Sequence, residues 1–357
     1  MNFLEYVTLN PKVSLEKGKI YPFIEMSDVS TCSRNPINIK YKSFDSGVKF
    51  EDGDTVIARI TPCLQNGKRF YCKDIGKGFG STEYLVFRPK NNSVDNLYLY
   101  YVLSTDFVKE SMVKSMVGAT GRQRVNNEVF SRLEMEFPDI DTQRRIASTL
   151  SAYDELIENN KKQIKLLEEA AQRLYKEWFI DLHEGWKEGT LGDIAEFKRG
   201  KTITKADVTE GPIPVVAGGL EPAYYHNKAN TTAPVITVSG SGANAGFARL
   251  YNENVFASDC SFADSTTTPY IFFVYCFLRA NKSSLDSLQK GAAQPHVYAK
   301  DINNMKLLIP TNIEMGSFCG FVSPYFKKMK TLQIQINKLT QARERLLPKL
   351  MSGEIEV

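Results

Sequence analysis

Residues 142–182 read TQRRIASTLSAYDELIENNKKQIKLLEEAAQRLYKEWFIDL, and this stretch decides the fold. Apolar or aromatic side chains recur in it at alternating steps of four and three, with one polar slot at Asn160. Such a heptad seam is typical of a helix that packs along its length against another helix. The sequence therefore predicts one long helix from Thr142 to about Leu182. Its seam residues are Ile146, Leu150, Tyr153, Ile157, Ile164, Leu167, Ala171, Leu174 and Trp178.

The same seam returns 172 positions later, so the chain carries two copies of one long helix. The second copy has a polar residue at Arg343, in the slot that Ala171 fills in the first. We expect Asn160 to fix the helix register and Arg343 to reach outward or to pair with a nearby Glu. The slots of the second copy are Phe318, Val322, Tyr325, Met329, Leu332, Ile336, Leu339, Arg343, Leu346 and Leu350.

The repeated helices divide the chain into an α+β protein with four segments. Residues 1–137 and 185–309 alternate short β-rich runs with Gly, Asp, Asn and Pro clusters, and each contains one helical interval, near 96–116 and 269–279. Residues 138–184 and 310–357 carry the long helices. We expect Asp141 to cap the first helix, Gly185 to follow its end at His183, and Thr311 with Glu314 to form a capping box for the second.

A heptad seam needs a partner, and the economical partner for each long helix is the other one. A duplicated unit usually packs about a pseudo-two-fold axis, which favours an antiparallel intramolecular coiled coil. About 40 residues at 1.5 Å per residue make a rod of roughly 60 Å, between one and two turns of duplex DNA. The alternative is a coiled coil that serves only to dimerise the protein.

The composition is that of an ordinary globular protein, and it excludes several classes. The 357 residues suffice for two or more cores, no apolar run is long enough to span a bilayer, and the N-terminus lacks a signal-peptide core. The six cysteines form no CxxC pair, so we expect reduced thiols, no metal site and a cytoplasmic location. A net charge of +4 permits a polyanionic partner without demanding one.

The chain resembles the specificity (S) subunit of type I restriction–modification systems over essentially its whole length. The motifs that carry this resemblance are FP at 137–138, QRRIA at 143–147, WF at 178–179, GW at 185–186, LGDIA at 191–195, RGK at 199–201 and LLPKLMSGE at 346–354. Two features depart from the family pattern. The first domain begins with FLEY at 3–6 instead of the GW…LGDIAE opening, and EMGS at 314–317 stands where the first helix has TQRR.

The resemblance implies two target-recognition domains, each reading one half of a gapped sequence in double-stranded DNA. It also implies that the helices space these domains and dock methyltransferase subunits. Two such subunits are expected, restriction subunits remain open, and no membrane is involved. S-adenosylmethionine is expected in the methyltransferase partner, with no cofactor in this chain.

The sequence offers no active site of its own. TTPY at 267–270 lacks the amide of an adenine methyltransferase tetrad, and GSGANAG at 240–246 is followed by strand and turn instead of the helix of a dinucleotide loop. GKGFGST at 76–82 has the wrong order for a phosphate loop, and the three histidines have no ligand partners at metal spacing. We therefore expect a non-catalytic chain.

Side chains suited to DNA gather in two loops that hold the same place in each half. GATGRQRVNNEVF at 118–130 and GAAQPHVYAKDIN at 291–303 each precede a long helix, with different hydrogen-bonding residues on the same scaffold. Arg can bind guanine bidentately and Gln can bind adenine, although either residue can also hold phosphate. The candidate DNA contacts are Arg59, Lys68, Arg69, Arg122, Gln123, Arg124, Lys198, Arg199, Lys201, Ser239, Ser241, Asn244, Gln294, His296 and Tyr298.

Two hypotheses from different classes remain. The first is a non-catalytic DNA-recognition subunit that recruits methyltransferases to a bipartite site. The second is a coiled-coil scaffold that joins two protein-binding modules without touching DNA, in which the polar loops are merely solvated turns. The dependence of DNA binding on salt separates them, because phosphate contacts weaken steeply as salt rises.

Overall fold

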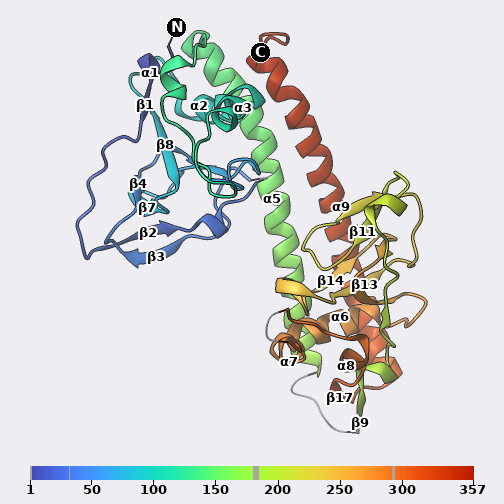
Figure 1. Ribbon diagram of the computed structural model, residues 1–357. Coiled ribbons are helices and arrows are strands. Elements are labelled where there is room, and N and C mark those ends of the chain that lie inside the picture. The colour runs from blue at the N-terminus through green and yellow to red at the C-terminus, as the bar shows by residue number, and fades with distance from the viewer. Residues whose placement is uncertain (1, 32, 180–184, 292–293) are drawn as a thin grey trace. The chain divides into compact units, whose positions relative to one another are not determined.

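The computed structural model describes residues 2–31, 33–179, 185–291 and 294–357 (Figure 1). The chain forms two compact units, of which unit 1 comprises Met1–Asn160 with Gln335–Val357 and unit 2 comprises Lys161–Ile334. Both long helices are present, α5 at Ile140–Phe179 and α9 at Asn312–Met351. Each unit therefore joins one α+β domain to a part of each long helix, which agrees with the predicted fold class.

The capping of the long helices follows the sequence in one case and differs in the other. The capping box of α9 is confirmed, because the Thr311 amide donates to Oε2 of Glu314 (2.7 Å) and the Glu314 amide donates to Oγ1 of Thr311 (3.2 Å). The cap of α5 is Asp139, and the prediction of Asp141 was wrong. Asp139 accepts from the Thr142 amide and hydroxyl, and these bonds lower its pKa. The predicted end of this helix near His183 lies outside the described residues.

Both domains are built from short strands that the hydrophobic runs supply. Unit 1 contains β1 (Val7–Leu9), β2 (Ile20–Ile24), β3 (Lys40–Ser43), β4 (Val48–Phe50), β5 (Thr55–Ala58), β6 (Arg69–Tyr71), β7 (Gly78–Gly80), β8 (Tyr84–Pro89), α1 (Phe3–Tyr6), α2 (Asn96–Val102), α3 (Asp106–Lys114) and α4 (Val129–Arg132). Unit 2 contains β9 (Lys187–Thr190), β10 (Lys198–Arg199), β11 (Ile213–Val216), β12 (Tyr224–His226), β13 (Val235–Ser239), β14 (Ala248–Tyr251), β15 (Phe256–Ala257), β16 (Cys260–Asp264), β17 (Lys306–Ile309), α6 (Ile271–Ala280), α7 (Lys282–Ser287) and α8 (Ala299–Asn303).

The two domains share one sheet topology. The antiparallel sheet β1-β8-β5-β6 of unit 1 corresponds to β10-β16-β13-β14 of unit 2. The sheet segment β3-β2-β7 corresponds to β12-β11-β15, and each contains one antiparallel and one parallel pairing. The structure thus bears out the duplication predicted from the helices.

Three local expectations differ from the structure. The helical interval of the first domain divides into α2 and α3, because Thr105 caps a new helix through its hydroxyl. The strand expected to end at Pro138 is reduced to a single bridge between Asn2 and Glu134, whereas the second domain forms the full β9–β17 pair. The strand expected over 254–257 contains only its last two residues, Phe256–Ala257.

The paired helices run antiparallel within each unit and complete its hydrophobic core. In unit 1 Ile146 and Leu150 of α5 lie in one cluster with Leu350 of α9, while Asn160 lies 3.3 Å from Gln335 through their side-chain amides. In unit 2 the Phe318 ring of α9 packs against Trp178 of α5. Every predicted seam side chain is buried or half-buried. Full burial of each large apolar side chain contributes about 1.5–3 kcal/mol, so neither domain core is complete without both helices.

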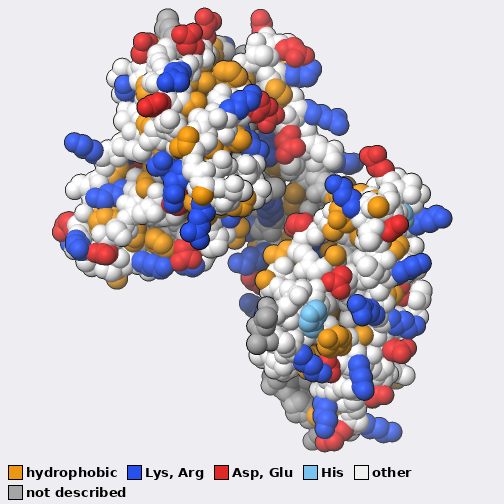
Figure 2. Space-filling view, in the orientation of Figure 1, with side chains coloured by type: hydrophobic (Ala, Val, Ile, Leu, Met, Phe, Trp, Pro, Cys, Tyr) orange, Lys and Arg blue, Asp and Glu red, His pale blue; other side chains and the backbone are white. Residues whose placement is uncertain are grey.

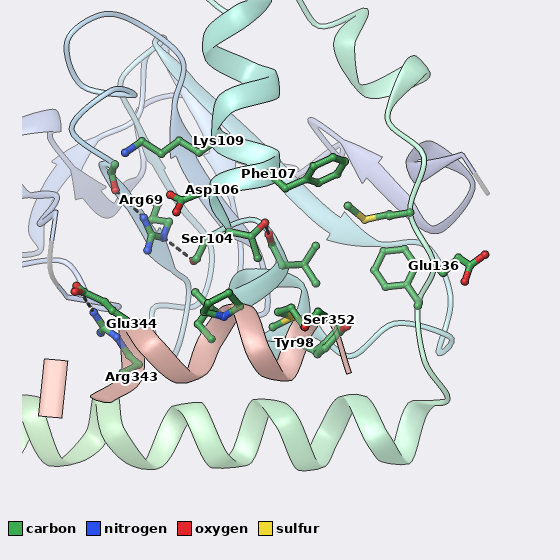
Figure 3. A pocket seen from close by; sticks show the side chains of 18 of the residues that line it. Arg69, Tyr98, Ser104, Asp106, Phe107, Lys109, Glu136, Arg343, Glu344 and Ser352 are labelled. Carbon is green, nitrogen blue, oxygen red and sulfur yellow. Dashed lines mark hydrogen bonds and ion pairs between the residues drawn. The ribbon is translucent and has the colours of Figure 1, made fainter. Parts of the chain in front are cut away.

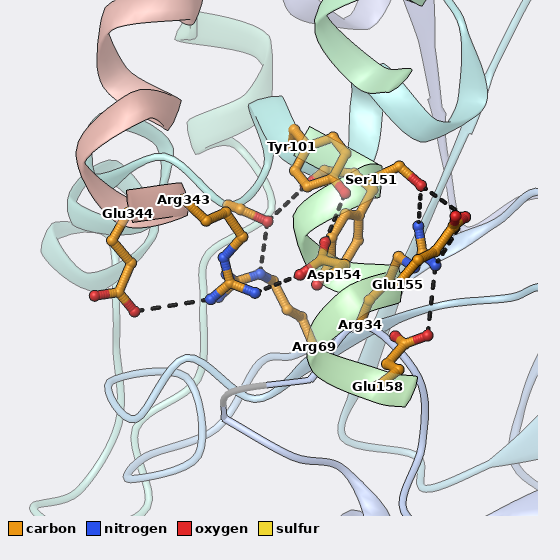
Figure 4. A network of polar contacts seen from close by, with 11 residues as sticks. Arg34, Arg69, Tyr101, Ser151, Asp154, Glu155, Glu158, Arg343 and Glu344 are labelled. Atoms are coloured by element: carbon orange, nitrogen blue, oxygen red, sulfur yellow. Dashed lines mark hydrogen bonds and ion pairs between the residues drawn. The ribbon is translucent and has the colours of Figure 1, made fainter. Parts of the chain in front are cut away.

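A buried polar network attaches the first domain to the helix pair of unit 1 (Figure 4). Asp154 of α5 is only 2 % exposed and pairs with Arg343 of α9, while the Tyr101 hydroxyl donates to Oδ2 of Asp154 at 2.6 Å. Burial and then the Asp154 charge raise the pKa of Tyr101, so this hydroxyl remains a donor. Arg343 also lies 3.7 Å from Glu344 as expected, but it turns inward, and its pairing with Asp154 was not predicted.

Arg34 forms the second part of this network. Its side chain is 2 % exposed, and Nη1 donates to Oγ of Ser151 at 2.7 Å. Nη2 lies 3.6 Å from the carboxylate of Glu158. Burial alone lowers the pKa of Arg34, but the negative groups around it, with Glu158 first and Asp154 among the others, together raise it above its usual value, so the guanidinium stays charged. The buried charge is therefore matched by charges on α5.

The corresponding positions of unit 2 are apolar. Phe326 lies 172 positions after Asp154, and Ala171 lies 172 positions before Arg343. Both are fully buried, and the Tyr275 ring packs edge-on against Phe326 at 5.9 Å, where Tyr101 of unit 1 instead bonds to Asp154. The same helix contact is thus held by an ion pair in one unit and by apolar packing in the other.

We expect Arg343→Ala to destabilise unit 1 by about 3–5 kcal/mol, because it leaves the Asp154 carboxylate buried and unpaired. The triple variant Asp154→Phe/Arg343→Ala/Tyr101→Phe copies the helix residues of unit 2, removes the hydroxyl that would lose its acceptor, and should regain most of this loss. Calorimetry should show Tm falling by roughly 6–20 °C for the single variant. Lys114→Ala, which breaks an exposed pair, is the control and should leave Tm nearly unchanged. If Tm of the triple variant falls as far as that of Arg343→Ala, the ion pair itself is required.

Candidate nucleic-acid interface

In the first domain, the turn after β5 and the loop before α4 are joined by backbone hydrogen bonds. The Thr61 amide donates to the Gln123 carbonyl (3.0 Å), and the Val125 amide donates to the Arg59 carbonyl (2.9 Å). The loop also closes on itself, because Val117 and Arg124 exchange both amide–carbonyl bonds at 2.9 Å. This arrangement holds residues 59–61 and 117–125 as one framework, here called platform 1.

The second domain contains the same framework, here called platform 2 and formed by residues 240–242, 290–291 and 294–297. The Gly242 amide donates to the Pro295 carbonyl (3.0 Å), and the Val297 amide donates to the Gly240 carbonyl (3.1 Å). Lys290 and His296 exchange both amide–carbonyl bonds at 2.8 and 2.9 Å. Each bond has its counterpart in platform 1, so the predicted equivalence of the two loops is confirmed.

The platforms carry different side chains on this common backbone. Platform 1 presents Arg122, Gln123 and Arg124, with Arg59 at its edge. Platform 2 presents Ser241 and Asn244 beside Gln294, His296 and Tyr298, which sequence reasoning had placed in two separate groups. The His296 and Tyr298 rings are nearly parallel, with an interplanar angle of 16° and centroids 6.1 Å apart.

An acidic residue lies at the same point of each framework. The Arg59 amide donates to the Glu83 carbonyl (2.9 Å), and the Gly240 amide donates to the Asp259 carbonyl (3.3 Å). The Glu83 carboxylate accepts from Nε and Nη2 of Arg124 at 2.6–3.0 Å, and this hydrogen bonding lowers the pKa of Glu83. Oδ2 of Asp259 lies 2.5 Å from Oγ of Ser241.

The basic run of the second domain lies beside platform 2. Lys198 and Arg199 form β10, which pairs with β16, the strand that begins directly after Asp259. The Gly200 amide donates to the Cys260 carbonyl (2.8 Å), and the Lys201 amide donates to the Ala257 carbonyl (3.0 Å). The side chains of Lys198, Arg199 and Lys201 are exposed. They can reach a polyanion that lies against the platform.

Several candidate residues make contacts within the protein itself, Ser239, Lys68 and Arg69 among them. Ser239 is 4 % exposed, and its hydroxyl donates to the Gly218 carbonyl at 3.0 Å, so it supports the Gly-rich loop instead of facing outward. Lys68 donates through Nζ to the Met26 carbonyl at 2.6 Å. Arg69 points away from platform 1 into a cleft of about 780 Å³ between the first domain and α9, where Nε donates to Oγ of Ser104 (Figure 3).

The surface and the charge pattern limit the chemistry. Figure 2 shows Lys and Arg side chains interspersed with Asp and Glu on the visible face of both units. The described residues contain no group of His, Cys, Asp and Glu that could hold a metal ion. Among these residues no helix is both long and apolar enough to cross a membrane. Phosphate contact would therefore depend on a few separate cations, as in β10.

Sequence reasoning missed Glu83, Asp259 and the network around Asp154. Both platform acids directly precede a buried strand, β8 or β16, which is the signal that could have found them. They are 176 positions apart, whereas the helices repeat at 172 positions, so a comparison at the helix offset does not align them.

The fold and site together define a class: a tandem duplication in which two domains present different polar residues on one loop framework, each domain packed on a shared helix pair. A model described as the type I restriction modification DNA specificity domain matches residues 7–169 and 183–341. The chain belongs to this family, with two copies of its domain, and is a type I restriction–modification specificity subunit.

Individual relatives agree with this assignment. The type I restriction enzyme MjaIX specificity subunit of Methanocaldococcus jannaschii is 27% identical over 308 residues, covering 75% of this chain and 71% of that protein. The specificity subunit S.MgeORF438P of Mycoplasma genitalium is 24% identical over 339 residues, covering 89% of this chain and 88% of that protein. A crystal structure of a type I restriction–modification S subunit from M. genitalium has the same fold. Its TM-score is 0.60 at 19% identity, and the match covers 98% of this chain and 95% of that one. Specificity subunits are non-catalytic, and the activity of such systems lies in the partner subunits.

We expect Thr61→Val to loosen platform 1 without affecting platform 2. Oγ1 of Thr61 accepts from the Gln123 amide at 3.0 Å, and an unsatisfied buried amide costs about 1–3 kcal/mol. The counterpart of Gln123 in platform 2 is Pro295, which has no amide hydrogen to satisfy. Amide hydrogen exchange should therefore accelerate at Gln123 and Arg124. Ser111→Ala on α3 is the matched loss of a hydroxyl and should leave these amides protected; unchanged exchange in Thr61→Val would contradict the role of the hydroxyl.

Proposed function

We propose that each domain reads one half of a gapped, bipartite site in double-stranded DNA with its loop platform. The observation that carries this proposal is the shared hydrogen-bond framework with different side chains on it. Backbone bonds keep the two readers in the same geometry, while Arg124 and Gln123 in one and Ser241 and His296 in the other offer different hydrogen-bonding groups. Two unlike half-sites require such a pair of readers.

The long helices supply the other part of this function. The seam residues hold α5 and α9 together, so the helices act as a spacer between the two readers and as the docking site of methyltransferase subunits. The chain binds no cofactor in this proposal, and S-adenosylmethionine belongs to the methyltransferase. The expectation of two methyltransferase subunits follows from the two copies of each domain and helix. The complex would work in the cytoplasm.

The exposed cations beside the platforms position DNA without reading its sequence. Lys198, Arg199 and Lys201 suit phosphate contact because they lie on an edge strand with their side chains in solvent. Arg122 has the corresponding role at platform 1, where Arg59 is half-buried and donates through Nη2 to the Val125 carbonyl at 3.2 Å. Base readout then falls to residues held in fixed geometry, and these are Arg124 in platform 1 and Ser241 in platform 2.

The direct test is to map methylated bases genome-wide in a host that carries the methyltransferase partner with and without this chain. We expect one gapped motif to appear only with the chain. Exchange of residues 186–309 for those of a relative should change one half of this motif and leave the other half intact. A methylation pattern that does not depend on the chain would exclude the proposal and favour the protein-binding scaffold.

Salt dependence provides an independent prediction. Lys198→Ala/Arg199→Ala/Lys201→Ala in the complex with the methyltransferase should weaken binding to all duplexes alike. The slope of log K against log salt should fall by about 0.9 for each phosphate contact removed. Lys327→Ala/Lys328→Ala, which removes two exposed cations of α9, is the matched control. An unchanged slope in the triple variant would show that β10 does not contact phosphate.

A further inference from the structure

The Arg124 guanidinium is fixed by Glu83 with one edge occupied and the other free. The carboxylate binds the edge formed by Nε and Nη2, while the side chain remains 47 % exposed. No partner for Nη1 lies among the residues that the structure describes. Because the Arg124 hydrogen bond lowers the pKa of Glu83, the carboxylate is ionised and the pair persists at neutral pH. Arg124 thus presents two parallel N–H donors from a held side chain.

The acid of platform 2 also accepts, but its neighbour Ser241 is left with the opposite hydrogen-bonding group to offer. The Ser241 hydroxyl donates a hydrogen bond to the carboxylate oxygen Oδ2 of Asp259. The oxygen of that hydroxyl then has only lone pairs to offer to a further partner. Gly218 lies against this residue, and a Cβ there would be 3.0 Å from the Ser241 carbonyl oxygen, so close packing keeps Ser241 in place.

We propose that the two platforms read opposite hydrogen-bond polarities: Arg124, positioned by Glu83, donates to guanine, and Ser241, oriented by Asp259, accepts from the amino group of adenine or cytosine. In the major groove guanine offers the acceptors O6 and N7, which match the free edge of a guanidinium. Adenine N6 and cytosine N4 carry the amino donors. This inference rests on the proposed function and names what each half-site must contain.

The acids also indicate which part of DNA the platforms face. A carboxylate close to the phosphates would meet like charge, and a narrow minor groove concentrates the negative potential. Glu83 and Asp259 lie within the frameworks themselves, so each platform tolerates a base edge better than a phosphate. The exposed cations that suit phosphate lie beside the platforms, as at β10.

For platform 1 the experiment is motif mapping in the complete complex with Arg124→Lys and Glu83→Gln. The wild-type motif should contain a guanine in one half. Arg124→Lys keeps the charge but loses the two-donor edge, so discrimination at that guanine should fall by roughly 5- to 150-fold. Glu83→Gln should relax the same position and no other, because Glu83 only positions Arg124.

For platform 2 the variants are Ser241→Ala and Asp259→Asn. The wild-type motif should require adenine or cytosine at one position of the other half. Ser241→Ala removes the acceptor and should relax that position. Asp259→Asn replaces an obligate acceptor with an amide that can donate, which frees the hydroxyl to donate outward. This variant should also admit guanine or thymine, whose major-groove carbonyls accept.

Arg132→Lys is the control, because it alters another exposed Arg–Glu pair of the first domain outside platform 1. It should leave the motif unchanged. The inference is overturned if the wild-type motif lacks guanine in the half that Arg124→Lys affects, or if the variants weaken methylation equally at all positions. Absence of any motif with the wild-type chain would instead refute the proposed function, so the two failures are distinguishable.

Discussion

The carboxylate of Asp154 sets the strongest constraint on unit 1. It is buried on α5, and its countercharge comes from Arg343 on α9, 189 residues further along the chain. An unpaired buried charge is strongly destabilising, so the N-terminal part of α5 is stable only when the C-terminal part of α9 lies against it. The Tyr101 hydroxyl, which donates to Asp154, attaches the first domain to the same ion pair. One buried charge therefore links three segments that are distant in sequence.

The contact between α5 and α9 in the second unit meets the same requirement without an ion pair. Phe326 and Ala171 replace the ion pair, and the aromatic cluster around Phe318 and Trp178 covers the seam. Replacing a buried ion pair with apolar residues of similar size is often neutral or stabilising, so both solutions are compatible with one fold. Their difference has a consequence for pairing. The α5 segment with Asp154 is a poor partner for the apolar α9 segment around Phe326, which favours the observed pairs over their exchange.

Much of this fold could be predicted because the repeated elements obey one simple period. The repeated seam predicted the duplication, the first residue of each long helix to within a few positions and the antiparallel pairing. The cap at Asp139 was missed because a side chain two residues earlier can serve the same amides. The inward direction of Arg343 was missed because the heptad pattern identifies a polar position but not the residue on the other helix, Asp154, that pairs with it. Pairing between segments so far apart is not visible in a local pattern.

The site was less predictable than the fold for a related reason. The predicted equivalence of the two loops is confirmed, since Arg124 and His296 lie at corresponding bridges of the two platforms. The contacts of Ser239 with the Gly218 carbonyl and of Arg69 with Ser104 were not visible in the sequence, because side-chain direction at a strand end depends on such neighbours. Glu83 and Asp259 were missed because the two domains differ in length before these residues. The offset between equivalent positions is therefore 176 here, and not the 172 of the helices.

The two platforms explain how one scaffold can carry unlike recognition surfaces. Their frameworks are made almost entirely of backbone bonds, which do not depend on side-chain identity. One side chain does take part in platform 1, where the Thr61 hydroxyl accepts from the Gln123 amide. In platform 2 the counterpart of Gln123 is Pro295, which has no amide hydrogen, so Gly242 can replace Thr61 without loss of a hydrogen bond. The acid at the common position then decides what its neighbour can do, holding a donor in Arg124 and leaving only an acceptor in Ser241. Substitution at a few exposed positions can change the polarity of a reader while the bonds that hold it remain the same.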